Sequence, residues 1–344
     1  MPPRHVDLAI TAPWILPIAP AGVLQGHSVL ADGGRIVAVV PDAVAERDYL
    51  ARERIALGSH VLMPGLVNAH THAAMSLLRG IADDVPLSTW LEVHIWPREA
   101  KFVTSELVHD GVLLAAAEML RGGVTCCNDM YFYPDAAARA YQAAGMRAVL
   151  GLPVLDFPTP YASDADSYLQ AGLAVRDAFR HAPRLGFALA PHAPYTVSDA
   201  TFEKVLTYAR QLDLSIQTHL QETRRELDEA IAATGQSPLA RLDRIGVTGP
   251  GFVAIHAVHL APGDIEVLAT QHCHVVHCPT SNLKLASGIA PVTELMRHVN
   301  VAIGTDGAAS NNRLDLFAET RLAALLAKVA SGDAAALPAQ TALH

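Results

Sequence analysis

The sequence is poor in cysteine, in charged side chains and in long apolar runs. Four cysteines in 344 residues are too few for a disulfide scaffold. No apolar run approaches the ~20 residues of a membrane-spanning helix. Charged residues make up only 17% of the chain, but hydrophobic residues reach 51%, which excludes disordered and collagen-like proteins.

The sequence also lacks a basic excess and a secretory leader. A formal net charge of −9 gives no basic footprint for nucleic acid or an anionic membrane, so we expect neither as a partner and favour a small molecule. The first ten residues, MPPRHVDLAI, contain no apolar core of a signal peptide. Together with the small number of cysteines, this predicts a cytoplasmic protein.

The length allows one large domain and a small one, since a single α/β barrel takes ~250 residues. Within residues 1–62, short apolar stretches at 6–17, 27–40 and 53–62 are broken by glycine or proline. An Asp-Gly-Gly turn divides the second stretch into two strand-like halves. This pattern predicts the N-terminal part of a small β-domain, an incomplete β-sandwich.

Residues 63–344 alternate short β-rich runs with longer helical patterns, such as 105–122, 199–213 and 314–330. The β-rich runs are apolar on both faces, as parallel strands covered by helices are. Eight such alternations predict a (β/α)8 barrel rather than an open sheet. The eight runs are 61–70, 123–130, 146–154, 184–192, 214–220, 252–260, 273–279 and 299–306.

Seven polar residues stand at or near the carboxyl ends of these runs. In a barrel those ends converge on one mouth, where catalytic groups lie, and packing does not explain seven such residues on one rim. The abundance of histidine, 17 in all, adds to the expectation of metal or proton chemistry. The seven are His70, His72, His192, His219, Glu222, His256 and Asp306.

Two of these histidines are spaced for metal binding. His70 and His72 are two residues apart, so on a strand their rings point the same way and reach one cation at ~2.0–2.1 Å. With His219 and Asp306 they supply three nitrogens and one carboxylate oxygen. This ligand set suits Zn²⁺ or another borderline divalent ion.

Three strand-end residues are candidates for moving protons. Glu222 follows His219 by three residues, so its carboxyl group lies near the metal, where it can stay protonated and donate to a ring nitrogen. His256 and Asp306 are candidates for holding and deprotonating a water molecule, whose pKa falls toward ~7 on Zn²⁺.

Three further residues have two interpretations each. Trp90, in the loop after the first run, forms either a wall of the pocket or a hydrophobic anchor of that loop. Ser310 and Asn311 either contact the substrate or cap a helix that starts near Leu314.

Five segments carry a family resemblance: PGLVNAHTHAAMSLLRG, APHAPYTVSD, THLQET, HCPTSNLKLASGIAP and GTDGAASNN. Together they resemble the amidohydrolase superfamily, and specifically its nucleoside-deaminase branch, the 5'-methylthioadenosine/S-adenosylhomocysteine deaminases. The resemblance runs from about residue 7 to the end of the sequence. The first segment is shared by many amidohydrolases, whereas the others are more specific.

The resemblance implies hydrolytic deamination of the adenine ring of 5'-methylthioadenosine, with S-adenosylhomocysteine and adenosine as further substrates. Ammonia and the inosine analogue are the implied products, and we expect a homo-oligomer. One zinc ion per subunit is implied, because His192 stands where binuclear relatives have a carbamylated lysine. The implied zinc ligands are His70, His72, His219 and Asp306.

The resemblance also implies roles for the remaining site residues. Glu222 is the implied proton donor to the purine ring, and His256 is the partner of the attacking hydroxide. Glu99, in IWPRE, matches a glutamate that holds the ribose hydroxyls, and His192, in APHAPY, contacts the substrate. We include Trp90 among the candidate substrate-binding residues.

The chain departs from the family in two places. Some members have arginines after the third run that suit a carboxylate-bearing substrate, but here that region reads GLPVLDFPTPYA, with no arginine before Arg176. A neutral pocket favours 5'-methylthioadenosine over S-adenosylhomocysteine. Relatives also continue beyond the point where this sequence stops, so we expect the C-terminal end of the family domain to be missing and strand edges of the small β-domain to be unpaired.

Two alternative functions remain. One is a related amidohydrolase acting on guanine, 8-oxoguanine or a triazine, which a substrate panel separates from the first interpretation. The other is a truncated zinc-binding homologue without activity, for which measured turnover is decisive.

Overall fold

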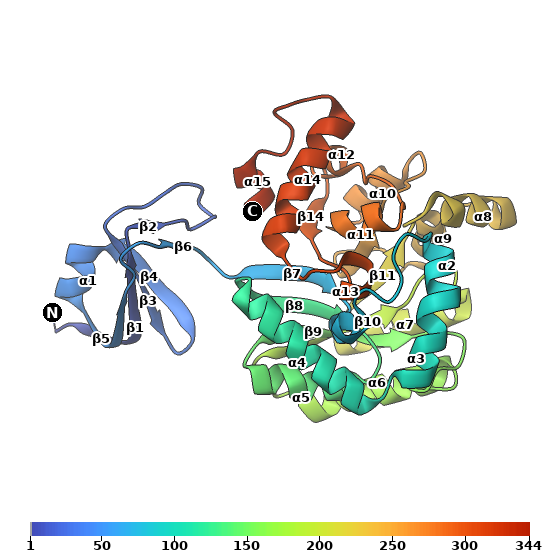
Figure 1. Ribbon diagram of the computed structural model, residues 1–344, viewed down its shortest axis with the longest axis horizontal. Helices are drawn as coiled ribbons and strands as arrows, with labels where there is room; N and C mark the ends of the chain where they lie inside the picture. The colour runs from blue at the N-terminus through green and yellow to red at the C-terminus, as the bar shows by residue number, and fades with distance from the viewer. Residues whose placement is uncertain (1) are drawn as a thin grey trace. The chain divides into compact units, whose positions relative to one another are not determined.

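The protein folds as two compact units in a computed structural model that describes residues 2–344 (Figure 1). One unit consists of the residues up to Gly65 together with Ala339–His344, and the other of Leu66–Pro338. Within the described part of the chain, no helix is both long enough and apolar enough to cross a membrane.

The smaller unit is built on a four-stranded sheet. Its elements are β1 (Arg4–Ala12), β2 (Trp14–Ile15), β3 (His27–Asp32), β4 (Arg35–Pro41), α1 (Asp42–Asp48), β5 (Tyr49–Ala56), β6 (Val61–Leu62) and α15 (Ala339–Leu343). The strand order is β4-β3-β1-β5, and β2 pairs with β6 separately. The predicted Asp-Gly-Gly hairpin is confirmed between β3 and β4, where Gly33 and Gly34 both have positive φ. Ala45 of α1 packs on the sheet against Val6 and Leu30.

The larger unit confirms the predicted barrel of eight parallel strands, in the order β14-β13-β12-β11-β10-β9-β8-β7. Each strand coincides with one of the eight predicted runs. The strands are β7 (Leu66–Thr71), β8 (Val124–Met130), β9 (Arg147–Val154), β10 (Leu185–Pro191), β11 (Ser215–Leu220), β12 (Phe252–His256), β13 (His274–His277) and β14 (Asn300–Ile303).

Helices connect the strands and cover the outside of the barrel (Figure 1). The three predicted helices are confirmed as α4, α7 and α14. The helical elements are η1 (Ala73–Leu78), α2 (Leu87–Thr89), η2 (Trp90–Ile95), α3 (Trp96–Phe102), α4 (Ser105–Arg121), α5 (Pro134–Ala144), α6 (Ala165–Phe179), α7 (Asp199–Leu212), α8 (Arg224–Thr234), α9 (Pro238–Ile245), α10 (Asp264–Thr270), α11 (Pro279–Lys284), α12 (Val292–Leu295), α13 (Ala308–Asn311) and α14 (Leu316–Ser331). Thr104, Ser198 and Thr223 start α4, α7 and α8 by accepting a hydrogen bond from the third helical amide.

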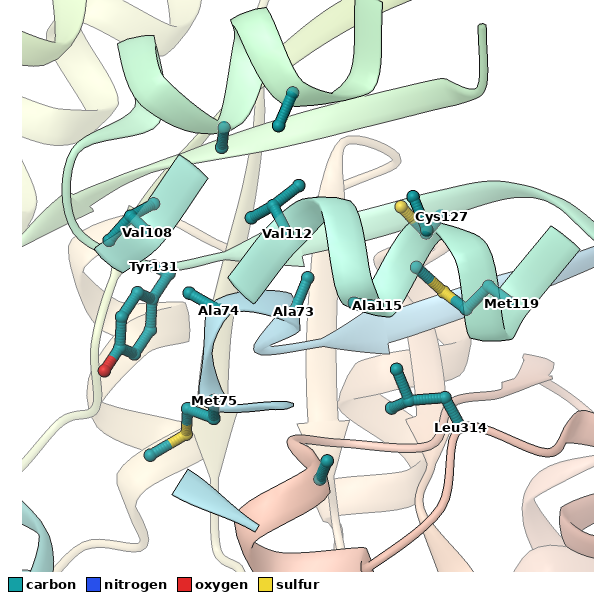
Figure 2. Close-up of a cluster of buried hydrophobic side chains, with 14 of the residues drawn as sticks. Ala73, Ala74, Met75, Val108, Val112, Ala115, Met119, Cys127, Tyr131 and Leu314 are labelled. Atoms are coloured by element: carbon teal, nitrogen blue, oxygen red, sulfur yellow. The ribbon is translucent and has the colours of Figure 1, made fainter. Parts of the chain in front are cut away.

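Helix α4 packs closely on η1 through small apolar side chains (Figure 2). Ala73, Ala74 and Ala115 are fully buried there. A Cβ atom at Gly111 would lie 2.5 Å from the backbone oxygen of Ala74, so only glycine permits this approach. The contact matters for the site because η1 begins directly after His72.

The first and eighth strands meet through side-chain hydrogen bonds. Asn68 of β7 donates to the Thr305 hydroxyl at 2.8 Å and accepts from the Thr305 amide at 3.0 Å. The Asp306 amide donates to the His70 carbonyl at 3.1 Å. A Cβ atom at Gly304 would lie 2.8 Å from that same carbonyl oxygen, which makes glycine necessary in the GTD segment. The closure of the barrel therefore brings His70 and Asp306 together.

Three predicted strands are too long. The run 61–70 holds two elements, because Val61–Leu62 forms β6 in the smaller unit, Pro64 and Gly65 interrupt the run, and β7 starts only at Leu66. The other two strands end early. The run 252–260 leaves the strand after His256, because His256 and Ala257 have φ of 73° and 45°. The run 299–306 ends as a strand at Ile303, and Asp306 also has a positive φ, 60°. In both places the backbone turns where a functional side chain is presented.

Candidate active site

The predicted site residues come together around one cavity of about 400 Å³ at the carboxyl ends of the barrel strands. Eight of the nine line it, and His70 lies fully buried behind them. The eight are His72, Trp90, Glu99, His192, His219, Glu222, His256 and Asp306.

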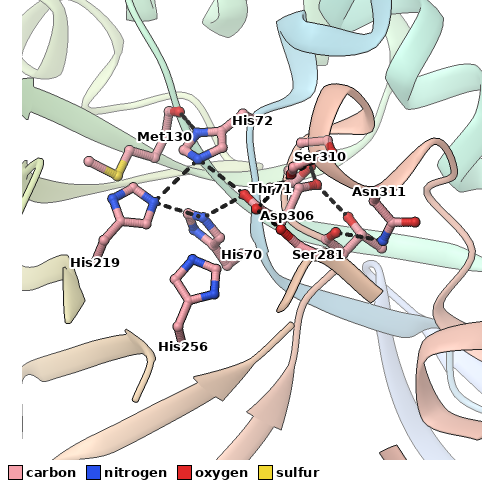
Figure 3. Close-up of polar contacts among 12 residues, drawn as sticks. His70, Thr71, His72, Met130, His219, His256, Ser281, Asp306, Ser310 and Asn311 are labelled. Atoms are coloured by element: carbon pink, nitrogen blue, oxygen red, sulfur yellow. Dashed lines mark hydrogen bonds and ion pairs between the residues drawn. The ribbon is translucent and has the colours of Figure 1, made fainter. Parts of the chain in front are cut away.

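Four donor atoms form a compact group (Figure 3). Nε2 of His219 lies 3.3 Å from Nε2 of both His70 and His72. Oδ1 of Asp306 lies 3.4 Å from Nε2 of His70 and 3.2 Å from Nε2 of His72. A tetrahedral zinc site with bonds of ~2.0–2.1 Å separates its ligand atoms by about 3.3 Å. The four side chains therefore fit one zinc ion.

Hydrogen bonds to backbone carbonyls orient two of the histidines. Nδ1 of His72 donates to the Met130 carbonyl at 2.5 Å, and Nδ1 of His219 donates to the His192 carbonyl at 2.8 Å. A proton on Nδ1 leaves the Nε2 lone pair free for a metal. The strand ends β8 and β10 thus select the tautomer that metal binding needs.

The close packing of the cluster shifts the pKa values of its members in different directions. Burial alone would raise the pKa of Asp306, but the adjacent His70 and His72 rings outweigh it and hold that pKa well below the ordinary value. Burial lowers the pKa of His70 to about 4. Although burial would lower it, the contact with Asp306 raises the pKa of His72 to about 9, so the His72 ring has to lose a proton when a divalent metal binds.

Glu222 and His256 face each other beside the ligand cluster. Oε2 of Glu222 lies 3.6 Å from Nε2 of His256, and Nδ1 of His256 is 2.8 Å from Oδ1 of Asn282. Since the Asn282 oxygen accepts, Nδ1 carries the proton and Nε2 is an acceptor. Burial raises the pKa of Glu222, which favours its protonated form.

Glu99 enters the cavity from α3. The Tyr131 hydroxyl donates to Oε1 of Glu99 at 2.7 Å, and burial raises the pKa of Glu99. Trp90 lines the cavity and is only 5% exposed, so it both forms a wall and anchors its loop. Nδ1 of His192 forms a hydrogen bond of 2.9 Å with the Thr196 hydroxyl. Burial lowers the pKa of His192 to about 3. The His192 ring is therefore neutral.

Both interpretations of Ser310 and Asn311 are wrong. The Ser310 hydroxyl donates to Oδ2 of Asp306 at 2.7 Å, and Asn311 donates to the Thr305 carbonyl at 2.7 Å. Helix α14 is capped by Asp315 instead. Both side chains make their hydrogen bonds within the loop that carries Asp306. They therefore neither line the cavity nor cap the helix.

The sequence interpretation missed several residues that support the site. Tyr131 follows the second strand, and the strand-end rule that found the histidines would have found it. Glu226 accepts from the Glu222 amide at 2.9 Å and donates its own amide to Thr223. The spacing Thr223-x-x-Glu226 is a capping-box signal. Ser281, whose hydroxyl donates to Oδ2 of Asp306, carries no comparable signal.

The rest of the cavity wall is largely aromatic and apolar. Trp96 packs against Phe157 with ring centres 5.8 Å apart, and Phe132 lies 6.4 Å from Tyr161. No lysine or arginine occurs among the residues that line this cavity in the described chain. The cavity thus combines an acidic, histidine-rich end with an uncharged wall.

Comparison with known proteins agrees with this geometry. The amidohydrolase family model matches residues 61–344. A 5-methylthioadenosine/S-adenosylhomocysteine deaminase from Teredinibacter turnerae is 48% identical over 98% of this chain and 77% of its own length. A crystal structure of an adenosine deaminase from Xanthomonas campestris with bound zinc superposes with a TM-score of 0.97 at 49% identity, over 99% of this chain and 78% of that one.

A more distant structure shares the fold. The atrazine chlorohydrolase of Arthrobacter aurescens superposes with a TM-score of 0.87 at 24% identity, covering 94% of this chain and 77% of that one. The family resemblance inferred from the five segments is confirmed by the family match and by relatives that are 48% and 49% identical to this chain over the aligned residues. The chain belongs to the amidohydrolase family.

Proposed function

We propose that this chain is a zinc-dependent aminohydrolase that converts 5'-methylthioadenosine to its inosine analogue and ammonia, with S-adenosylhomocysteine and adenosine as further substrates. The observation that carries the proposal is the group of four donor atoms, all within 4.8 Å of one another, in a cavity that also holds Glu222, His256 and Glu99. The names of the similar proteins, deaminases of adenine nucleosides, support the same reaction.

His70, His72, His219 and Asp306 would hold the zinc ion. Zinc bound there supplies Lewis-acid chemistry, which lowers the pKa of a water molecule from 15.7 toward about 7. Oδ1 of Asp306 is buried and has no hydrogen-bond partner within residues 2–344. A buried carboxylate oxygen without a partner is what we expect where a metal ion binds.

The proton transfers fall to Glu222 and His256. Glu222, whose pKa is raised by burial, donates a proton to a ring nitrogen as the water oxygen bonds to C6. Nε2 of His256 accepts the water proton and returns it to the amino group. The bond between C6 and the amino nitrogen then breaks and ammonia leaves, while the C6 hydroxyl becomes the carbonyl of the product by giving its remaining proton back to Glu222.

The remaining lining residues define the substrate class. The Glu99 carboxyl group, fixed by Tyr131, is placed to accept hydrogen bonds from two ribose hydroxyls, and the neutral ring of His192 would contact the base. The apolar wall with Trp96 and Phe157 suits a methylthio group. A homocysteine carboxylate would lack a cationic partner there, so we expect kcat/KM for 5'-methylthioadenosine to exceed that for S-adenosylhomocysteine at least about tenfold.

The test is ammonia release by the zinc-loaded protein from 5'-methylthioadenosine, S-adenosylhomocysteine, adenosine, guanine and melamine. We expect the fastest release from the first. Faster release from guanine or melamine would contradict the substrate class, and faster release from S-adenosylhomocysteine would contradict the neutral-pocket argument. Folded, zinc-bound protein without turnover on the whole panel would contradict the enzymatic assignment.

We further propose a cytoplasmic homo-oligomer. All four cysteines are free, as in a reducing compartment. Leu325 and Val329, one turn apart on α14, are 43% and 77% exposed and offer apolar surface for a second copy. Light scattering after size-exclusion chromatography tests this, and a monomer at micromolar concentration would contradict it.

A further inference from the structure

The carboxylate of Asp306 has two oxygens in different surroundings (Figure 3). Oδ2 accepts from the hydroxyl of Ser281 at 2.6 Å and from the hydroxyl of Ser310 at 2.7 Å. Oδ1 has no hydrogen-bond partner in the described chain and faces the histidine nitrogens. A carboxylate oxygen offers about two lone-pair sites, so the two hydroxyls fill those of Oδ2.

The two serines reach Asp306 from separate elements. Ser281 lies on α11, after the seventh strand, and Ser310 lies on α13, after the eighth. Their exposed fractions are 0% and 1%, so water does not compete for these hydrogen bonds. The Ser310 hydroxyl also lies 3.1 Å from the Gly307 carbonyl, but its shorter contact is with Asp306.

One further carboxylate ties the two serine-bearing segments together. Oε2 of Glu319, on α14, accepts from the amide of Thr280 at 3.0 Å, directly before Ser281. Oε1 of Glu319 accepts from the side chain of Asn311 at 2.8 Å, directly after Ser310. Both hydroxyls are thus held at fixed positions relative to each other, and the carboxylate between them has little freedom to rotate.

We propose that Ser281 and Ser310 are positioning residues for the metal centre: they clamp Oδ2 of Asp306, so that Oδ1 is the single oxygen presented to zinc. This inference rests on the proposed zinc site. A carboxylate without the clamp can rotate about its χ2 bond or offer both oxygens. Hydrogen bonds behind a metal ligand typically change metal affinity 10–100-fold.

The experiment measures zinc affinity in Ser281→Ala and Ser310→Ala by competition with a chromogenic chelator. We expect each variant to bind zinc about 10–100-fold more weakly than the parent protein, and the double variant more weakly still. The matched control is Ser76→Ala, because Ser76 is 4% exposed and its hydroxyl has no partner in the described residues. The control should keep the parent affinity.

Two further measurements separate positioning from folding. Thermal unfolding of the metal-free variants should resemble that of metal-free parent protein, whereas the stabilisation added by zinc should shrink. Cobalt substitution reports the coordination directly: the visible absorption bands should shift in the serine variants and not in Ser76→Ala. The conservative Ser310→Thr keeps a hydroxyl and should regain most of the zinc affinity.

The outcomes distinguish this inference from the proposed function. Parent protein that binds zinc and releases ammonia, beside serine variants of unchanged zinc affinity and unchanged cobalt spectrum, overturns the clamp and leaves the function standing. Weakened zinc affinity in both variants supports the clamp even if no substrate of the panel is turned over. Parent protein that binds no zinc overturns both.

Discussion

The metal-ligand cluster at His70 and His72 and the apolar layer that begins at Ala73 are consecutive in the chain, yet they depend on different forces. In the layer, many small side chains contribute burial, and each gains ~25 cal/mol per Å² of apolar surface. In the cluster, a few directed contacts of 2.5–3.4 Å fix the histidine rings and the Asp306 carboxylate. Removing one methyl group from the layer should therefore lower the free energy of unfolding by a limited amount. Removing one ligand from the cluster should instead impair metal binding.

The largest expected effect lies at Glu222. Glu222→Gln keeps the shape and removes the transferable proton, so we expect kcat to fall about 10²–10⁴-fold with zinc affinity unchanged. Steady-state kinetics and metal analysis on the same preparation test it. Glu229→Gln, at an exposed ion pair on α8, is the control and should keep parent activity. Near-parent kcat in Glu222→Gln would refute the assigned role.

At Gly111 we expect a change in the apolar layer to affect the metal-ligand cluster as well. A methyl group there meets the Ala74 backbone at 2.5 Å, so Gly111→Ala should displace η1 and with it His72. We expect a loss of stability of about 3 kcal/mol and a lowered zinc affinity. Val112→Ala, at the next position, is fully buried and should cost about 2 kcal/mol without changing zinc affinity. Denaturant unfolding and zinc titration of both variants give the answer; equal zinc affinities would show that the two regions are independent.

A smaller effect is expected at Tyr131, on the substrate side of the cavity. Tyr131→Phe removes the hydrogen bond to Glu99 but keeps the ring. A hydrogen bond to a charged group contributes about 1.5–3 kcal/mol, so we expect KM to rise about tenfold or more while kcat changes little. If kcat fell and KM did not move, Glu99 would act in the chemical step rather than in binding.

The smallest effect concerns pH and Glu226. Burial raises the pKa of Glu226 to about 7, above its ordinary 4.5. A raised carboxyl pKa means that the folded state binds the proton more tightly, so this contribution to stability is present below pH 4.5 and lost as the pH rises through 7. Glu226→Gln retains an acceptor for the Glu222 amide and removes the charge.

We therefore expect Glu226→Gln to be more stable than the parent protein at pH 8, by about 1 kcal/mol because the side chain is partly exposed. At pH 4 the two proteins should have the same stability. Thermal unfolding at both values tests this. A difference that is the same at the two pH values would mean that the charge of Glu226 has no part in it.

Much of the fold was legible because barrel strands and helices have local signals. Apolar runs of strand length marked all eight strands, and the helical patterns at 105–122 and 199–213 marked α4 and α7. The ends of β12 and β14 were placed too late, since positive φ at His256 and Asp306 is imposed by the surrounding loops and not by the residue type. The candidate site residues could be named in advance because ligand spacing and strand-end placement act over a few residues, and the structure brings them to one cavity.

By itself, the sequence determined the alternation of strands and helices and the group of histidines and aspartate, and it predicts the acid role of Glu222, since these follow from residue type and short-range spacing. Only the tertiary structure decided which oxygen of Asp306 faces the histidines, why Gly304 and Gly111 are required, and which serines hold the metal ligand. Those features join residues far apart in the chain, such as Asn68 and Thr305. Contacts of that kind are formed when the barrel closes, and no local pattern encodes them.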